Sequence, residues 1–118
     1  SDRGSTGLRT DGRMHVFGDE SNWGVFNGTT VLQGSTDASI QLLTGVFDTT
    51  DALRESGTET ASGDAGNDNL VDLRMGDNFE EASPFVGDVG FYEVHDGAVS
   101  GGLSTREQEI ADMWDITI

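Results

Sequence analysis

The chain has 118 residues, of which 22 are acidic, six are arginine and none is lysine, so its formal net charge is −16 at neutral pH. Such a charge argues against binding to nucleic acid or to an anionic membrane surface, because both need a basic footprint. The absence of cysteine excludes a disulfide framework, a thiolate metal site and a cysteine nucleophile. No apolar run approaches the roughly 18 residues of a membrane span, so membrane insertion is not expected.

The excess of acid indicates an environment of concentrated salt. A small domain in ordinary medium carries a net charge of roughly 2 to 8 in magnitude, because repulsion between like charges opposes compaction. At molar salt the screening length falls to about 3 Å, which nearly removes this repulsion. An ordinary acidic tail would be a block of like charge with few aromatics, whereas here the acids are scattered among nine aromatic residues. We interpret the chain as one domain of an extremely halophilic protein.

Short apolar runs separated by glycines, with a single proline, indicate an all-β fold with tight turns. The longest apolar run, 39–47, is expected at the centre of a sheet. Asn27 and Gly28 predict a type I′ hairpin turn, because both tolerate a positive φ, and Gly57 predicts a second hairpin. Residues 63–69 are expected to form a polar loop. The predicted strands are, in chain order, 13–18, 23–26, 29–33, 39–47, 52–56, 58–62, 70–75 and 84–94.

One helix of about ten residues is expected near the C-terminus. Ser104 can cap its first turn while Glu107 reaches back to the backbone, which is the capping-box pattern. Helical spacing places four apolar side chains on one face, namely Leu103, Ile110, Ala111 and Trp114. This face predicts that the helix, including Trp114, packs on the strands.

The order of these parts resembles a known family. Residues 42–48 have the sequence LLTGVFD, residues 73–76 LRMG and residues 85–94 FVGDVGFYEV, and the helix follows. The series resembles the laminin-G-like domain, in which an LLTGVFD-type strand precedes a hairpin and an F-x-G-x-I-x-E strand leads into an LS-x-x-E helix. His95 stands where that family usually has tyrosine. The resemblance implies an all-β, concanavalin A-like jelly-roll β-sandwich with one short C-terminal helix.

The resemblance divides the chain into an N-terminal extension, 1–12, and a laminin-G-like domain, 13–118, that lacks the family's opening strands. A strand without its neighbour presents unpaired backbone groups, so we expect another segment or another subunit to supply the missing strands. Because the sequence begins with Ser1, it is either a processed product or part of a longer polypeptide.

No pattern of catalytic residues stands out. Hydrolytic members of the jelly-roll superfamily carry paired acids on one strand, and no E-x-D-x-E run occurs here. Glu107 and Glu109 have a related spacing, but on a helix their side chains do not face one another. His15 and His95 each lack a nearby nucleophile motif. The chain is therefore expected not to be an enzyme.

Trp23 is the candidate residue for carbohydrate binding. It lies between a polar turn and a hairpin, where it is either a core residue, which we favour, or a platform for stacking a sugar ring. In the second case Asn22 and His95 are the accompanying candidate ligand-binding residues.

Calcium is the one cofactor that the sequence brings into consideration. The 63–69 loop gathers oxygen ligands of the kind that calcium prefers, in Asp64, Asn67 and Asp68. Asp48 and Asp51 form a second cluster. No EF-hand spacing is present, and in a chain this rich in aspartate such clusters also arise by chance.

These observations favour a non-catalytic structural or adhesion module displayed on an extracellular assembly of a halophile, such as a virion decoration, turret or fibre, or a cell-surface layer. The alternative is a carbohydrate-binding module of a secreted halophilic protein. The expected partners are other protein subunits of a larger assembly and surface glycans. The expected location is extracellular or on a virion surface.

Overall fold

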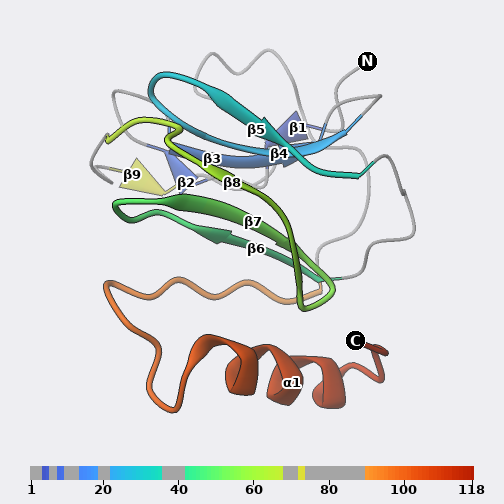
Figure 1. Cartoon of the computed structure of the whole chain (residues 1–118). Coiled ribbons are helices and arrows are strands. Elements are labelled where there is room, and N and C mark those ends of the chain that lie inside the picture. The colour runs from blue at the N-terminus through green and yellow to red at the C-terminus, as the bar shows by residue number, and fades with distance from the viewer. Residues whose placement is uncertain are drawn as a thin grey trace.

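Figure 1 shows a computed structural model of the whole chain. It describes residues 22–35, 42–67 and 90–118, together with the backbone of four short segments at 4–5, 8–9, 14–18 and 72–73. Strands dominate, and one helix lies near the C-terminus. Within the described residues, this confirms the prediction of an all-β fold with a terminal helix. Two antiparallel sheets are stacked, and the helix forms a further layer beneath the second sheet (Figure 1).

The first sheet has four antiparallel strands in the order β1-β3-β4-β5. These strands are β1 (Gly4–Ser5), β3 (Met14–Gly18), β4 (Trp23–Asn27) and β5 (Val31–Gln33). A two-stranded sheet pairs β2 (Leu8–Arg9) with β9 (Asp72–Leu73). Strands β1 and β2 lie in the segment predicted to be an N-terminal extension, so this segment pairs with the four-stranded sheet through β1 and with β9 through β2.

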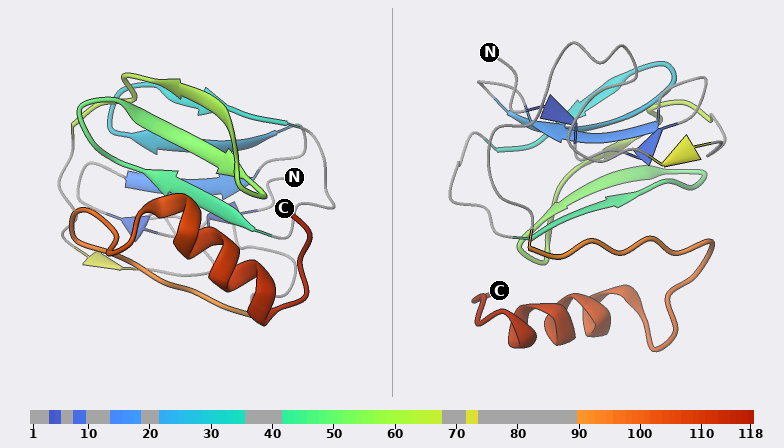
Figure 2. Two further views of the ribbon diagram at one scale, coloured as in Figure 1. Left: turned by 60° about the horizontal axis from the view of Figure 1, so that its bottom comes forward. Right: turned by 180° about the vertical axis from the view of Figure 1, so that it is seen from behind.

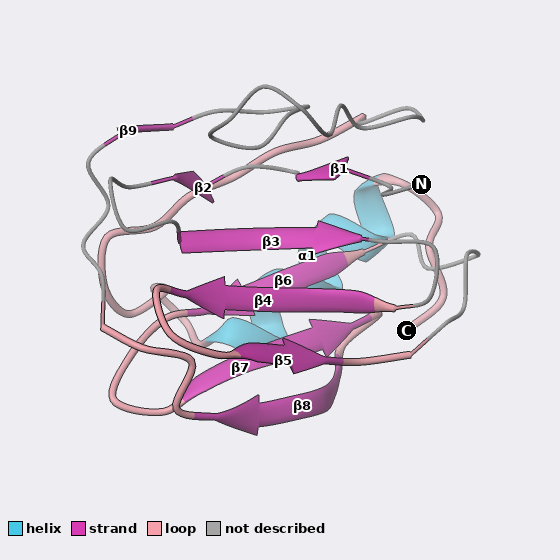
Figure 3. Ribbon diagram, turned by 90° about the horizontal axis from the view of Figure 1, so that it is seen from above, coloured by secondary structure: helices cyan, strands magenta, loops and turns pink. Residues whose placement is uncertain are grey.

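The second sheet has three antiparallel strands in the order β6-β7-β8, seen from above in Figure 3. These strands are β6 (Leu43–Val46), β7 (Asp51–Glu55) and β8 (Thr58–Gly63). The prediction that 39–47 is a central strand is wrong, because β7 is central and β6 lies at the edge of the described sheet. The apolar character of this run instead reflects that β6 is covered on both faces. Leu43 packs against the core on one face, and Thr44 contacts the helix on the other.

The core lies between the two sheets. Trp23 and Val25 of β4 pack against Leu53 of β7, and all three are buried. Side chains alternate along β7, so Leu53 faces the core while Arg54 faces the helix. Four partly buried side chains surround this cluster, namely Leu32, Leu43, Phe47 and Ala61. Each fully buried Val or Leu contributes roughly 1.5–3 kcal/mol to stability.

The type I′ turn belongs to the second hairpin rather than the first. Ser56 and Gly57 form the two-residue loop between β7 and β8, with φ of 47° and 82°. A positive φ at both positions is what type I′ requires. At the first hairpin only Gly28 has a positive φ, while Asn27 is the last residue of β4 and is buried. The type I′ prediction at Asn27 and Gly28 is wrong because the Asn27 side chain is bound in the interior.

The segment that leads to the helix crosses beneath the second sheet (Figure 2). Residues 90–94 are not strand, so the predicted 84–94 strand is wrong for this part, and residues 84–89 lie outside the described residues. Side-chain contacts to the helix hold the segment, since Glu93 binds Arg106 and the Trp114 ring lies against Gly90.

Helix α1 (Leu103–Met113) confirms the predicted terminal helix but not its predicted cap. The N-cap is Gly102, with φ of 96° and no side-chain capping bond, and Ser104 lies within the first turn. Glu107 is directed at the sheet, where it binds Arg54, so it cannot reach back to the helix start. The capping-box prediction is therefore wrong.

The buried face of α1 is made by Glu107, Ile110 and Ala111. Trp114 does not continue this face, contrary to the sequence prediction: it lies at the C-cap and is 50% exposed. The chain leaves helical geometry directly afterwards, where Asp115 has φ of 54°. The Trp114 indole lies against Gly90, in the segment before the helix.

Candidate functional site

Three acidic side chains are buried among the described residues, namely Asp51, Glu55 and Glu107. Burying a carboxylate is unfavourable unless hydrogen bonds or an opposite charge compensate for the lost water. Each of the three carboxylates therefore has specific hydrogen-bonding partners, and each joins two parts of the fold.

Asp51 joins the first hairpin to the loop after β8. Its Oδ1 accepts hydrogen bonds from the Asp48 amide and from Asn27 Nδ2, both at 3.2 Å, and its Oδ2 accepts one from the Ala65 amide at 2.9 Å. Asn27 Nδ2 also donates to the Gly66 carbonyl at 3.0 Å. Asn27 Oδ1 is buried and accepts no hydrogen bond from the described residues. Asp51 and Asn27 thus tie this loop to the first hairpin through their side chains.

Glu55 joins β7 to the end of β5. Both of its carboxylate oxygens accept from the Ser35 amide, at 3.0 and 3.1 Å, and Oε1 also accepts from Ser35 Oγ at 2.8 Å. Gly34 packs so closely beside this pair that a Cβ there would lie 2.5 Å from Glu55 Oε2. The contact ties the first sheet to the second at one end of the core.

Glu107 joins the helix to the second sheet. Arg54 donates to it through Nε, at 3.0 and 3.1 Å, and through Nη2 at 2.8 Å, and Thr44 Oγ1 donates at 3.0 Å. Arg54 Nη2 also donates to the Gly57 carbonyl at 2.7 Å. The hydrogen bond to Glu107 raises the pKa of Arg54, so the guanidinium stays charged. The Glu107 side chain is only 3% exposed, which makes this a buried, bidentate ion pair.

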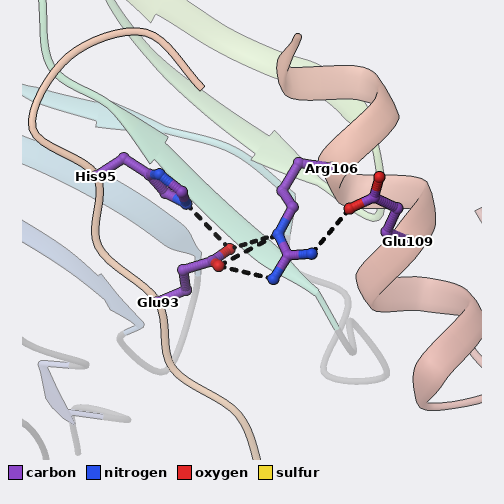
Figure 4. Close-up of polar contacts among 4 residues, drawn as sticks. All are labelled: Glu93, His95, Arg106 and Glu109. Carbon is purple, nitrogen blue, oxygen red and sulfur yellow. Dashed lines mark hydrogen bonds and ion pairs between the residues drawn. The ribbon is translucent and has the colours of Figure 1, made fainter. Parts of the chain in front are cut away.

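A second cluster of charged residues lies on the surface between α1 and the segment before it (Figure 4). Arg106 Nη2 donates to Glu93 Oε1 at 2.7 Å, and Arg106 Nη1 donates to Glu109 Oε2 at 2.8 Å. His95 Nε2 lies 3.1 Å from Glu93 Oε2. The hydrogen bonds from Arg106, aided by His95, lower the pKa of Glu93 from 4.5 to about 2. The guanidinium is bound by two carboxylates, so Arg106 is not free to bind an anionic ligand.

The three predicted ligand-binding residues do not form one site. Trp23 is buried in the core at 6% exposure, which agrees with the favoured interpretation and leaves no ring face for stacking. Asn22 Nδ2 donates to the Gly34 carbonyl at 2.8 Å within the first sheet's connections. His95 lies instead beside the helix, in the cluster of Figure 4.

The predicted calcium ligands are only partly described. Asp64 is exposed and its Oδ1 accepts from the Gly66 amide at 3.0 Å, Asn67 is exposed, and Asp68 lies outside the described residues. Asp51, from the second predicted cluster, is committed to the hydrogen bonds given above. No group of three or more His, Asp or Glu side chains suited to a metal occurs within the described ranges.

Neither Arg54 nor the role of Glu107 as its buried partner was predicted from the sequence. Glu107 carried a signal that could have revealed it, because it lies on the same helical face as Ile110 and Ala111, where a charged residue needs a buried partner. Arg54 carried a weaker signal, since it alternates with Leu53 on a predicted strand and therefore points to the opposite face.

No family model, curated protein or solved structure matches this chain. The described part of the chain contains no helix with the length and apolar character that crossing a membrane requires.

Proposed function

We propose that the chain is a non-catalytic structural or adhesion module displayed on an extracellular assembly of a halophile, such as a virion decoration, turret or fibre, or a cell-surface layer. On this proposal the chain folds as a laminin-G-like, concanavalin A-like jelly roll, and its partners are other protein subunits of the assembly. The location is extracellular or on a virion surface.

The use of the buried carboxylates carries this proposal. In an enzyme, acids of perturbed environment converge on a cleft, where they can act on a substrate. Here Asp51, Glu55 and Glu107 each bind groups of the framework and lie at three separate junctions. The buried acids of this chain hold the sheets, the loop and the helix together. This use suits a structural module, which must keep its shape.

The surface charge supports the same proposal. A net charge of −16 keeps the surface hydrated at salt concentrations that precipitate ordinary proteins. Such salt surrounds any assembly exposed to the medium of an extreme halophile.

Localisation in the native source tests the proposal. Electron microscopy with a specific antibody should place copies at repeated positions on a particle or on the cell surface. A uniformly intracellular distribution would contradict display. Reproducible hydrolysis of a polysaccharide by the purified chain, lost on substitution of a single acid, would contradict the non-catalytic assignment.

One observation favours the second candidate, a carbohydrate-binding module. Trp114 is half exposed, so its indole offers the ring surface that Trp23 does not. A glycan array in high salt should then give a signal that Trp114→Ala abolishes and Met113→Ala, at the neighbouring exposed position, retains. Absence of any glycan signal for the unaltered chain removes this candidate.

A further inference from the structure

The C-terminal unit, residues 103–118, is attached to the rest of the fold through a distinct link. The link is residues 96–102, whose side chains are exposed apart from the half-buried Val99. Its described backbone hydrogen bond runs from the Gly102 amide to the Val99 carbonyl at 3.0 Å. Gly97, Gly101 and Gly102 have φ between 83° and 99°, and a Cβ added to any of them would meet nothing within 4 Å. Glycine at three of its seven positions gives the link backbone freedom, and its side chains apart from Val99 are exposed.

The C-terminal unit is held by contacts with residues that precede the link in the chain. Glu107 binds Arg54 and Thr44 of the second sheet. Arg106 binds Glu93 of the segment before the link. The Trp114 ring lies against Gly90, and the Ile118 side chain lies against Gly57. The helix and its tail can thus dissociate from the sheet and bind again as one unit, without any change in the contacts inside residues 103–118.

The receiving surface on the sheet is specific for this piece. Arg54 offers a fork of donors, and Thr44 adds a third donor to the same carboxylate. Once the helix is removed, Arg54 and Thr44 would lose the carboxylate to which both donate. In a chain with 22 acids and six arginines, the group that matches this surface in charge, hydrogen bonding and helical packing is another copy of the same helix.

We propose that two copies of this chain associate by exchanging their C-terminal units, so that Glu107 of each copy binds Arg54 of the other. The contacts in the exchanged dimer are the same as in the single chain, and only the path of the link differs. Seven residues in extended form span about 25 Å, which suffices to reach a neighbouring sheet. Concentrated salt favours the encounter, because it screens the repulsion between two strongly acidic copies. This proposal concerns association alone and does not depend on where the protein is displayed.

Charge-reversal variants test the exchange directly. R54E places two acids opposite each other within one chain, and E107R places two bases there, so neither variant can seat its own helix. Upon exchange between the two variants, one junction regains the original pair and the other gains a reversed pair. Mixing them in about 3 M salt, where exposed charges are screened, should give a complex of twice the mass of either variant, measured by light scattering and native mass spectrometry. A mixture that stays the sum of its two components would overturn the proposal.

A second variant covers the case in which the single charge reversals fail to fold. Deleting residues 97–101 leaves every contact residue in place but makes the link too short to turn the helix back onto its own sheet. This variant should be a dimer at all concentrations that light scattering can follow. A compact monomer with α1 protected from hydrogen exchange would overturn the proposal.

The double variant R54E/E107R is the control for the charge-reversal experiment, since the reversed pair within one chain should restore the behaviour of the unaltered protein.

Discussion

Arg54 and Arg106 each bind a glutamate in nearly the same way, with closest N–O distances of 2.8 and 2.7 Å, but in different surroundings. The Arg54–Glu107 pair lies between helix and sheet, with side chains 16% and 3% exposed. The Arg106–Glu93 pair lies on the surface, with side chains 28% and 25% exposed, and Arg106 also binds the more exposed Glu109.

The difference shows how a strongly acidic chain can use the same chemistry for two purposes. A surface ion pair contributes about 0–1 kcal/mol and is weakened by salt, because water and ions already stabilise both charges. A buried pair is shielded from salt, and removing one partner leaves an uncompensated charge in the interior. In concentrated salt only the buried pair is expected to matter for stability.

The largest effect is expected from Glu107→Gln. Arg54 would lose its counter-charge while remaining between sheet and helix, so the free energy of unfolding should fall by about 3–5 kcal/mol. Hydrogen exchange should show α1 released before the sheets unfold. Glu109→Gln is the matched control on the same helix and should change the free energy of unfolding by less than about 0.5 kcal/mol. Equal effects of the two substitutions would refute the distinction between buried and surface pairs.

A smaller but clear effect is expected from Asp51→Asn. The amide cannot accept from the three donors that now bind the carboxylate, so at least one buried donor loses its partner, at a cost of about 1–3 kcal/mol. Chemical denaturation measures this loss of unfolding free energy. Asp96→Asn, at an exposed position, is the control. If Asp51→Asn proved as harmless as the control, the loop would not depend on this carboxylate.

Glu93→Gln should have a still smaller effect that disappears with salt. We expect a loss of at most about 1 kcal/mol at low salt and no measurable loss at high salt, because the pair with Arg106 is exposed. Paired denaturation curves at both salt concentrations measure this. A loss that persisted in high salt would show that the surface cluster, too, holds the helix in place.

The same residue predicts a pH dependence of definite sign. The pKa of Glu93 is about 2 in the fold and 4.5 in its ordinary state, so the folded state favours the ionised form. Its contribution is present in full above pH 4.5 and is lost as the pH falls toward about 2. The difference in unfolding free energy between the unaltered chain and Glu93→Gln, measured at low salt, should shrink across this interval. A difference that is constant or grows on acidification would contradict the assignment.

Local patterns predicted those parts of the fold that depend on neighbouring residues. Helical spacing of Ile110 and Ala111 predicted α1, and Gly57 predicted the hairpin between β7 and β8. The errors occurred where a distant partner competes with a local preference. Glu107 could have closed a capping box, but the buried guanidinium of Arg54, 53 positions away, binds it more strongly.

The first hairpin shows the same competition. Asn27 tolerates a positive φ, yet its side chain binds Asp51 and the Gly66 carbonyl, so the turn forms differently. No alternation or spacing of residues within 22–35 indicates that Asn27 has a partner in another sheet. The partners of Asp51 and Glu55 could not be predicted for this reason, whereas the burial of Trp23 followed from its place on an alternating strand.

Thermal unfolding between about 0.1 and 3 M sodium chloride, with Glu107→Gln and Glu93→Gln alongside the unaltered chain, tests the central claim most directly. The claim is that buried carboxylates hold a fold whose acidic surface needs salt. The midpoint of the unaltered chain should rise steeply with salt, the deficit of Glu107→Gln should persist through the series, and the deficit of Glu93→Gln should vanish. A midpoint that does not change with salt, or a Glu107→Gln deficit that salt removes, would contradict it.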